Sequence, residues 1–481
     1  MMELAQDRYS SLNHGAGIIF CIRSKHFIFS LSVRNCLPAK YSVAIVGLGF
    51  VGLSMGVCFA KLGRNVLGVD VDKKKIVMIG RGHVPFHEPN LGRLLHGSLS
   101  KGFEVSTNVR LVANAPMIFV AVGTPSREDG SMDEKYLRSA ASDIGSSING
   151  SKSYPLIVVK STVIPGTLLN LVVPEIEKAS GLKYGKGFGA CSNPEFLREG
   201  SAVRDTLKPD RIVIGGSKKD VKILESFYAK VYGKNLPKII TTNPYNGELI
   251  KYANNAFLAM KVSFANSLAR ICEMLPEGDV KVITEGIGLD KRIGPLFLRA
   301  GLGFGGSCFP KDIRAFIEFS KKLGHSPPIA EATLQINRVQ PLRAVEMAEE
   351  KVGKLKGKKV SILGLAFKPD TDDMREAVSI TIIEELLKKG AIVYAHDPKA
   401  LENASMIFKK RVKLVSSAKE CLKGSDCAIL VTEWKDYLTL RPKDFKALMK
   451  KPILIDGRRL FDAQEFSKSL DYAAIGLGRS F

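Results

Sequence analysis

The segment YSVAIVGLGFVG, residues 41–52, contains the pattern that decides the fold. A short apolar run predicts a buried strand, and the GxGxxG turn that follows it leads into a predicted helix. Gly47 permits the tight turn, Gly49 lets the backbone approach a pyrophosphate, and Gly52 lets helix and strand pack closely. Asp70 ends the next predicted strand, where its carboxylate would accept hydrogen bonds from an adenosine ribose and repel a 2′-phosphate. We therefore expect a dinucleotide site that prefers NAD, although a glycine turn without a ligand gives the same pattern.

A second strand and glycine turn, KKVSILGLAFKP, occupies residues 358–369. Its turn lacks the full glycine set, so we expect no second dinucleotide there. Both halves also contain short unbroken apolar runs bounded by turns, a pattern typical of parallel strands buried on both faces. These runs are NVLGVDVD (65–72), APMIFVAVGT (115–124), YPLIVVKST (154–162), AIVYAHDP (391–398), DCAILVTE (426–433) and KPILIDGR (451–458). The fold class that we predict is α/β, with two Rossmann-like doubly wound parallel-sheet domains.

A helical segment separates the two predicted sheets. Apolar residues recur at helical spacing in the stretch NGELIKYANNAFLAMKVSFANSLARICEML, and Asn243 or Asn246 is available as the cap of this helix. By analogy, a helical layer between two such domains forms a subunit interface, so we expect a homodimer through the central helices. The predicted boundaries are an N-terminal extension of unknown role at 1–40, and domains at 41–237, 238–350 and 351–481.

The composition limits the possible partners. Hydrophobic residues make up 45% and charged residues 25% of the chain, and its formal net charge is +23. The basic residues are scattered and no nucleic-acid-binding signature accompanies them, so we expect a solvated basic surface and no nucleic-acid partner. The apolar runs are too short to span a bilayer, and we expect no membrane partner. The eight cysteines form no CxxC pair, so the sequence indicates no metal site and a reducing, cytoplasmic location.

The stretch GLGFGGSCFPKDI, residues 301–313, places one cysteine beside a glycine-rich turn. Pro310 suits the first turn of a helix, so Cys308 should lie at the N-terminus of that helix. The helix terminus and Lys311 would both favour a thiolate, and Asp312 could hold a water molecule or act as a base. A buried, inert cysteine remains the alternative.

Lys251 and Asn255 lie four residues apart and should share one face of a helix. A lysine beside an amide donor could stabilise an oxyanion, although an exposed lysine on an amphipathic helix gives the same spacing. NAD, a thiolate and such a lysine together suit an alcohol-to-acid oxidation. The thiolate would form a thiohemiacetal that is oxidised to a thioester, and water would then release the acid.

Several motifs in order resemble those of the nucleotide-sugar 6-dehydrogenases, the UDP-glucose/GDP-mannose dehydrogenase family. They are GLGFVG, VAVGTPSREDGSMD, KSTVIPGT, NPEFLREG, KYANNAFLAMKVSFANS, DKRIG, GFGGSCFPKD, GLAFKPDTDDMREA and DGRRL. The resemblance extends from about residue 41 to the end. It implies an NAD-binding domain at 41–237, a dimerisation domain at 238–350 and a UDP-sugar-binding domain at 351–481. The implied reaction oxidises the C6 alcohol of UDP-glucose to UDP-glucuronate with NAD.

The resemblance also implies roles for individual residues. Cys308 would be the nucleophile, Lys251 with Asn255 would stabilise the oxyanion, and Asp312, Thr162 and Glu195 would position water and move protons. The implied cofactor contacts are Gly47, Gly49, Phe50, Val51, Asp70, Lys75, Thr124, Thr162, Glu199 and Lys311. The implied substrate contacts are Phe196, Leu197, Lys251, Asn255, Arg292, Phe304, Gly305, Phe367, Lys368 and Arg459, with Arg292 reaching across the dimer interface.

Some features keep local explanations or depart from the family. Thr162 could bond locally where its strand ends, and Glu195 could cap a helix after Pro194. His87 stands where the family usually has tyrosine.

Three other functions remain open. A related enzyme could act on UDP-galactose, UDP-N-acetylmannosamine or GDP-mannose. A two-electron hydroxyacid dehydrogenase would share the first domain and the Lys-x-x-x-Asn pair, but it would need no cysteine. A cofactor-binding scaffold or a nucleic-acid binder would need neither the Lys-x-x-x-Asn pair nor the cysteine.

Overall fold

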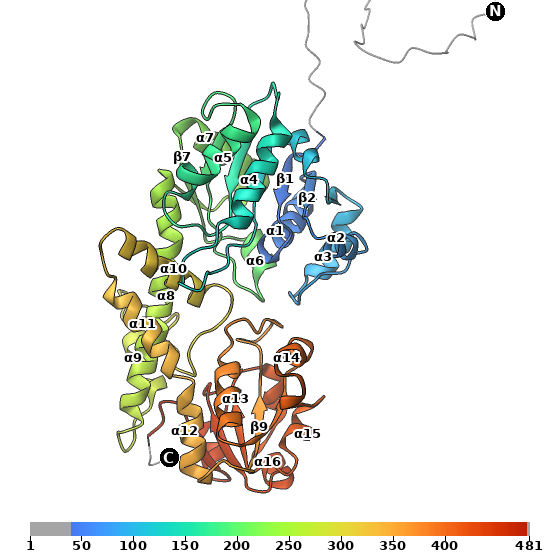
Figure 1. The fold of residues 1–481 in the computed structure, drawn as a ribbon. Helices are drawn as coiled ribbons and strands as arrows, with labels where there is room; N and C mark the ends of the chain where they lie inside the picture. Colours follow the sequence, from blue (N-terminus) through green and yellow to red (C-terminus); the bar gives the residue numbers. More distant parts are fainter. Residues whose placement is uncertain (1–39, 479–481) are drawn as a thin grey trace, which may run out of the picture. The chain divides into compact units, whose positions relative to one another are not determined.

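The computed structural model describes residues 40–478 (Figure 1). Apart from Lys40, the predicted N-terminal extension lies outside the described residues. Two α/β domains and a central group of helices account for the described chain, as the sequence pattern predicts.

The first sheet has eight strands in the order β3-β2-β1-β4-β5-β6-β7-β8. Its strands are β1 (Val43–Val46), β2 (Val66–Val69), β3 (Phe103–Ser106), β4 (Met117–Val120), β5 (Leu156–Val159), β6 (Gly189–Ser192), β7 (Arg211–Gly216) and β8 (Lys238–Thr242). Neighbouring strands are parallel except β6 and β7, which run antiparallel. The predicted parallel sheet is therefore confirmed in all but this one pair.

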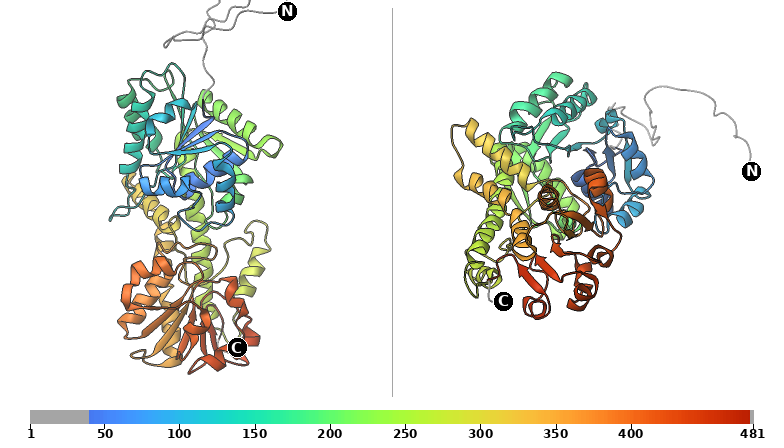
Figure 2. Two further views of the ribbon diagram at one scale, coloured as in Figure 1. Left: turned by 90° about the vertical axis from the view of Figure 1, so that its right-hand side faces the viewer. Right: turned by 60° about the horizontal axis from the view of Figure 1, so that its bottom comes forward.

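Both faces of the first sheet are buried under helices (Figure 2). Along β1, Val43 and Ile45 face one apolar cluster, whereas Ala44 and Val46 face another. This alternation explains why the strand is an unbroken apolar run. The helices are α1 (Phe50–Lys61), α2 (Lys73–Gly80), α3 (Leu91–Leu99), α4 (Lys135–Ile148), α5 (Val173–Ser180), α6 (Ala202–Leu207) and α7 (Lys218–Tyr232), with shorter turns η1 (Val109–Asn114), η2 (Leu168–Val172) and η3 (Gly233–Asn235).

The second sheet repeats the order of the first six strands, β11-β10-β9-β12-β13-β14, and all its pairs are parallel. Its strands are β9 (Lys359–Leu363), β10 (Ile392–His396), β11 (Lys413–Leu414), β12 (Cys427–Leu430), β13 (Ile453–Asp456) and β14 (Asp471–Ala474). Around it lie α13 (Val378–Lys388), α14 (Leu401–Phe408), α15 (Ala418–Leu422), α16 (Pro442–Leu448) and α17 (Ala463–Ser467), with η4 (Lys409–Arg411) and η5 (Lys435–Thr439). The predicted second doubly wound domain is therefore confirmed.

The central helices are α8 (Pro244–Cys272), α9 (Val280–Gly288), α10 (Phe309–Lys322), α11 (Pro328–Val339) and α12 (Leu342–Val352). Asn243 caps α8, because its side chain accepts a hydrogen bond from the backbone N–H of Asn246 at 2.9 Å.

Two of the predicted domain boundaries differ from the structure. Strand β8, predicted to open the central segment, pairs with β7 in the first sheet. Helix α12, predicted to close it, packs on β12 and β13 of the second sheet. Both elements are exposed or amphipathic stretches, and their local periodicity does not show which of the two neighbouring domains each belongs to.

None of the helices in residues 40–478 is both long enough and apolar enough to cross a membrane.

Candidate active site

The glycine turn between β1 and α1 has the geometry expected of a pyrophosphate cradle. Gly47 adopts a φ of +94°, which favours glycine. A Cβ on Gly52 would lie 1.9 Å from the carbonyl oxygen of Gly47, so only glycine lets α1 pack this closely. A Cβ on Gly49, at the N-terminus of α1, would meet no atom within 4 Å, so the backbone there faces open space. These residues fit a dinucleotide phosphate placed at a helix N-terminus; Phe50 and Val51 begin that helix.

Asp70 joins the end of β2 to the glycine turn. Its Oδ2 accepts a hydrogen bond from the backbone N–H of Leu48 at 2.8 Å, and its Oδ1 accepts one from Asp72 at 3.0 Å. Lys75 lies 2.8 Å from the same Oδ2. Burial opposes the charge of Asp70, but Lys75 and the backbone donors hold the pKa of its carboxyl below the usual range. The site therefore presents an ionised carboxylate beside the cradle, as NAD recognition requires.

Thr124 and Thr162 tie the carboxyl ends of β4 and β5 together. The Thr124 hydroxyl donates a hydrogen bond to the carbonyl oxygen of Thr162 at 2.9 Å. Ligands of doubly wound sheets bind at this edge. No hydrogen bond joins the Thr162 side chain to Glu195 or Cys308 within residues 40–478, so its role at the reacting centre stays a prediction.

Lys251 of α8 forms a buried ion pair with Glu195. Its Nζ lies 2.9 Å from Glu195 Oε1 and 5.4 Å from the centre of the Phe196 ring. Burial opposes the ammonium charge, but Glu195, Cys308 and Asp312 together raise the pKa of Lys251. The alternative of an exposed lysine is therefore wrong, because the Lys251 side chain is only 4% exposed.

Glu195 belongs to a loop and does not cap a helix. Its Oε2 accepts a hydrogen bond from the backbone N–H of Leu197 at 2.5 Å, and α6 begins only at Ala202. The turn aims the other carboxylate oxygen at Lys251. Phe196 and Leu197 also border a small cavity of about 70 Å³, whose lining includes Lys160.

One turn further along α8, Asn255 contacts the helix that carries Cys308. Its Nδ2 donates a hydrogen bond of 2.7 Å to Oδ2 of Asp312, and Lys311 Nζ lies 2.5 Å from Oδ1 of the same carboxylate. Asn255 and Asp312 are buried. The predicted pairing of Lys251 and Asn255 on one face of α8 is confirmed, and Lys311 is directed at Asp312.

Cys308 is the N-cap residue of α10, as the sequence predicts. Its sulfur lies 3.5 Å from Oγ of Ser307. Burial raises the pKa of the thiol to about 11, and Glu195 adds to the rise more than Lys251 offsets it. The structure does not support the expected resting thiolate, because burial, Glu195 and Asp312 all raise the pKa of the thiol.

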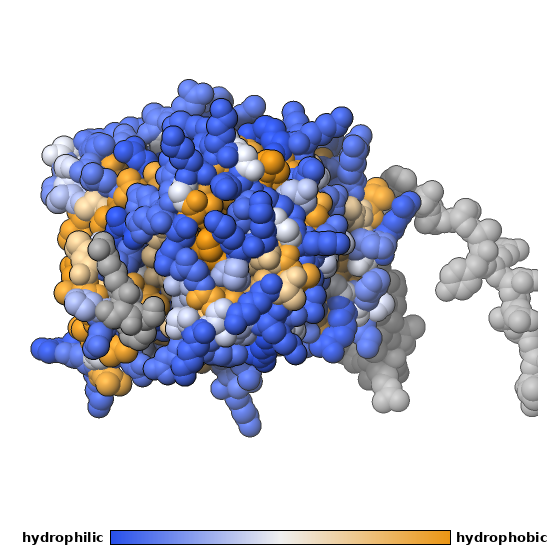
Figure 3. Space-filling view, turned by 90° about the horizontal axis from the view of Figure 1, so that it is seen from below, coloured by the Kyte–Doolittle hydropathy of each residue, from blue (hydrophilic) through white to orange (hydrophobic). Residues whose placement is uncertain are grey.

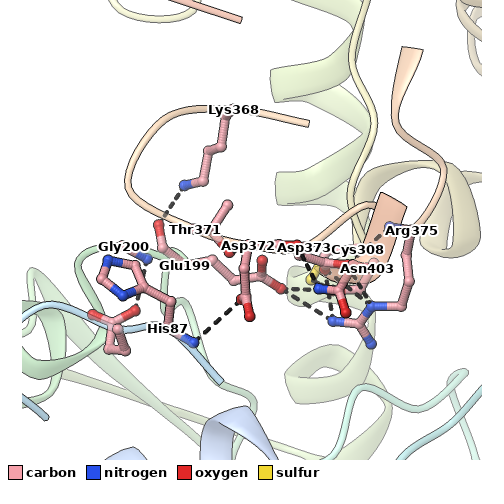
Figure 4. A network of polar contacts seen from close by, with 12 residues as sticks. His87, Glu199, Gly200, Cys308, Lys368, Thr371, Asp372, Asp373, Arg375 and Asn403 are labelled. Atoms are coloured by element: carbon pink, nitrogen blue, oxygen red, sulfur yellow. Dashed lines mark hydrogen bonds and ion pairs between the residues drawn. The ribbon is translucent and has the colours of Figure 1, made fainter. Parts of the chain in front are cut away.

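The loop that follows Glu195 contacts the third domain beside Cys308 (Figure 4). Lys368 donates a hydrogen bond to the carbonyl oxygen of Glu199, and Arg375 approaches Oε1 of Glu199 at 3.4 Å. The backbone N–H of His87 donates to Oδ1 of Asp372 at 3.2 Å. These contacts join the first domain to the third domain near the cysteine.

Two glycines permit this approach. A Cβ on Gly305 would lie 2.3 Å from the carbonyl oxygen of Glu376, and a Cβ on Gly306 would lie 2.7 Å from the Phe367 ring. Gly305 and Phe367, both predicted substrate contacts, therefore lie where the third domain meets the cysteine loop.

Three other predicted substrate contacts pair with residues outside this group. Phe304 packs on Phe309 and its backbone pairs with Asn337. The Arg459 guanidinium is buried against Asp279, with both N–O distances 2.9 Å. The Arg292 side chain is 89% exposed and pairs with Asp290 of its own loop.

Ser307 and Arg375 also belong to the site, although neither was predicted from the sequence. Ser307 links Glu199 to the neighbourhood of Cys308, because its hydroxyl donates a hydrogen bond of 2.9 Å to Glu199 Oε1. Both residues lie inside motifs quoted above: Ser307 directly precedes Cys308, and Arg375 shares a motif with Lys368. These positions were the available signal.

The chain matches three domains of one protein family. The NAD-binding domain of the UDP-glucose/GDP-mannose dehydrogenase family matches residues 41–233, its central domain matches 245–339 and its UDP-binding domain matches 361–463.

Curated proteins and solved structures agree with this match. The UDP-glucose 6-dehydrogenase AglM of Haloferax volcanii is 40% identical, over 90% of this chain and 99% of that protein. The UDP-glucose 6-dehydrogenase TuaD of Bacillus subtilis is also 40% identical, over 91% and 93%. A UDP-glucose dehydrogenase structure from the archaeon Pyrobaculum islandicum superposes with a TM-score of 0.84 at 38% identity, covering 93% of this chain and 100% of the other. With its NAD-binding domain and its site around Cys308, the chain belongs to the UDP-glucose/GDP-mannose dehydrogenase family and is a dehydrogenase.

Proposed function

We propose that this protein oxidises the C6 alcohol of UDP-glucose to UDP-glucuronate, a four-electron oxidation with NAD. The main observation behind the proposal is that Cys308 lies near two buried pairs of side chains. These are the ion pair Lys251–Glu195 and the hydrogen-bonded pair Asn255–Asp312. A two-electron alcohol dehydrogenase has no use for the cysteine. The names of the 40% identical relatives support UDP-glucose as the sugar nucleotide.

The cysteine would carry the substrate between the two oxidations. When bound, NAD accepts a hydride, and the whole reaction uses two NAD molecules per sugar. Cys308 adds to the C6 aldehyde, and the resulting adduct puts a negative oxygen near the ammonium of Lys251. The raised pKa of Lys251 keeps that ammonium charged at neutral pH.

The remaining step is release of the acid from Cys308. Asp312 is held by Asn255 and Lys311, so its carboxylate has a fixed direction and can orient a water molecule. Glu195 is the other carboxylate of the site, and its Oε1 lies 2.9 Å from Lys251 Nζ. Both carboxylates are therefore candidates for orienting the attacking water.

The deciding experiment counts NADH molecules formed per UDP-glucose. We expect two for the wild-type protein and, for Cys308→Ser, at most slow oxidation that stalls before the acid. Full activity of Cys308→Ser would contradict the thioester route, and one NADH per substrate would favour a two-electron dehydrogenase. Rates with UDP-galactose, UDP-N-acetylmannosamine and GDP-mannose test the sugar, since no turnover of UDP-glucose beside rapid turnover of another nucleotide sugar would exclude our assignment.

We also propose that the protein is a homodimer through its central helices. Phe257, Phe264 and Ile271 are spaced by seven residues on α8 and are 59%, 51% and 50% exposed, so they form an apolar stripe. Apolar side chains also gather at the left of Figure 3, the side on which Figure 1 draws α8, α9 and α11. Sedimentation of Phe264→Asp should give a monomer where the wild type gives a dimer. A wild-type monomer would exclude the interface.

A cytoplasmic location is part of the same proposal. All six cysteines of the described chain are free thiols, as expected in a reducing compartment. Protein found outside the cytoplasm after cell fractionation would contradict it.

A further inference from the structure

Cys308 needs a base, and the structure leaves few that are free. Its thiol is protonated at rest, since burial raises its pKa to about 11. Glu195 is engaged by Lys251, and Asp312 is engaged by Asn255 and Lys311. Lys251 lies 2.9 Å from Glu195 and Lys311 lies 2.5 Å from Asp312, and a cation this close weakens a carboxylate as a proton acceptor more than Arg375, 3.4 Å from Glu199, does. The proton must therefore leave by another route.

Ser307 provides a path from the sulfur to a third carboxylate. Its Oγ lies 3.5 Å from Cys308 Sγ, and its hydroxyl donates a hydrogen bond of 2.9 Å to Glu199 Oε1. The thiol can donate a hydrogen bond to Ser307 Oγ while the Ser307 hydroxyl donates one to Glu199. The three groups then form a continuous chain of hydrogen bonds from the sulfur to the carboxylate. Figure 4 shows Glu199 and Cys308 side by side at this point.

We propose that Ser307 and Glu199 form a proton relay that ionises Cys308 as it attacks the aldehyde, which rests on the proposed function. The thiol proton passes to Ser307 Oγ as the Ser307 hydroxyl proton passes to Glu199 Oε1. The sulfur electron pair forms the new C–S bond, and the π pair of the C=O bond moves to the oxygen beside Lys251. The step needs no oxidant, and it leaves Glu199 neutral.

The electrostatics of Glu199 suit this task. Burial and the nearby Asp373 raise the pKa of Glu199 to about 7, and Arg375 and Lys368 limit the rise. A base with a pKa near the working pH is both available and strong enough to take a proton. Arg375 and Lys368 come from the third domain, so the contacts of that domain help to ionise the base.

The relay leaves room for the cofactor contact predicted for Glu199. It uses only Oε1, whereas Oε2 is buried and has no hydrogen-bond partner within residues 40–478. Oε2 can therefore accept a hydrogen bond from a bound ligand while Oε1 receives the proton.

The test measures alkylation of Cys308 by iodoacetamide in the protein without cofactor or sugar, from pH 5.5 to 9.5, by mass spectrometry of the Cys308 peptide. Below the pKa of Glu199 the acceptor is already protonated, so the relay is blocked. We expect a first rise in rate with a midpoint near pH 7, followed by a second rise toward the pKa of the thiol. The charged groups that act on the pKa of Cys308 are Lys251, Glu195 and Asp312. Those that act on the pKa of Glu199 are Asp373, Arg375 and Lys368.

Three variants isolate the relay. Glu199→Gln and Ser307→Ala should each remove the rise near pH 7 and slow alkylation at pH 8 at least fivefold, and Ser307→Thr should restore it through its hydroxyl. Glu318→Gln removes an α10 carboxylate that pairs with Lys321 and should change nothing. The isosteric Glu199→Gln decides the matter if Ser307→Ala proves misfolded.

A wild-type profile without the rise near pH 7, or a rise that persists in folded Glu199→Gln, would overturn the relay. Neither result depends on turnover. A normal alkylation profile with no oxidation of UDP-glucose would reject the proposed function and leave the relay intact.

Discussion

The ammonium nitrogen of Lys251 lies 2.9 Å from Glu195 Oε1, and the two side chains are only 4% and 7% exposed. A buried ion pair of this kind costs desolvation energy, so it indicates a use other than stability. Within this pair the raised pKa of Lys251 keeps its ammonium charged, so it can face the oxyanion that the proposed reaction develops at Cys308.

Lys251→Met should therefore slow the reaction sharply. Methionine keeps the length of the side chain but removes the charge that faces the oxyanion. We expect kcat to fall by about 10² to 10³, the typical loss for one oxyanion donor. Steady-state NADH formation measures it.

Lys261→Met is the matched control on the same helix. Lys261 donates to the carbonyl oxygens of Ile293 and Gly294, away from the cysteine. We expect near-normal kcat for this variant. A kcat for Lys251→Met within threefold of the wild type would remove Lys251 from the oxyanion role.

Asp312→Asn should stop the reaction late, at hydrolysis of the thioester. The asparagine can still contact Asn255, but it loses the charge that Lys311 balances and that would orient the water. We expect a kcat about 10²-fold lower, the usual size of a general acid–base contribution. Intact-mass spectrometry after mixing with UDP-glucose and NAD should detect the protein with the sugar nucleotide attached.

Asp471→Asn controls for the loss of a carboxylate, because Asp471 pairs with Lys351 at the surface, and neither residue is assigned to the site. It should neither slow the reaction nor collect adduct. Rapid turnover by Asp312→Asn without adduct would assign the water to another group.

Asp70→Ser should weaken the preference for NAD over NADP. The carboxylate of Asp70 would repel a 2′-phosphate, and Lys75, now 2.8 Å from it, would become free to pair with that phosphate. We expect the ratio of kcat/KM for NADP to that for NAD to rise about tenfold, equivalent to ~1.4 kcal/mol. Initial rates with each cofactor measure the ratio.

The double variant Asp70→Ser/Lys75→Ala tests the cause. It should lose the gain with NADP, because the cation that would bind the phosphate is gone. An unchanged ratio in Asp70→Ser would show that other groups select the cofactor.

The local features of the fold were predictable because they depend on short-range rules. The strand β1, the turn at Gly47, the cap by Asn243 and the helix start at Cys308 each follow from a few neighbouring residues. The antiparallel pairing of β6 with β7 was not predictable, because their direction is set by the connection between them.

The charges of the site were less predictable than its members. Lys311 was expected to favour a thiolate at Cys308, but its ammonium pairs with Asp312. The pKa of Cys308 depends on burial and on Glu195, which lies more than 100 residues away in the sequence. Likewise, only the tertiary structure brings Arg375 to Glu199.

Gly305→Ala should weaken binding of the sugar nucleotide. Its φ lies outside the left-handed region, so the backbone accepts alanine, but the new Cβ would lie 2.3 Å from the carbonyl oxygen of Glu376. The third-domain segment would have to move away from the Cys308 loop. We expect KM for UDP-glucose to rise about tenfold, ~1.4 kcal/mol, with a smaller change in KM for NAD.

Gly286→Ala is the matched control, because its Cβ on α9 would meet no atom within 4 Å. A helical glycine replaced by alanine should leave KM unchanged and raise thermal stability slightly, by up to about 1 kcal/mol. If Gly305→Ala binds UDP-glucose as the wild type does, the close approach of Glu376 to the cysteine loop is not needed for substrate binding. A rise in both KM values would instead point to a general loosening of the site, because the two ligands are bound by different domains and only one contact has been disturbed.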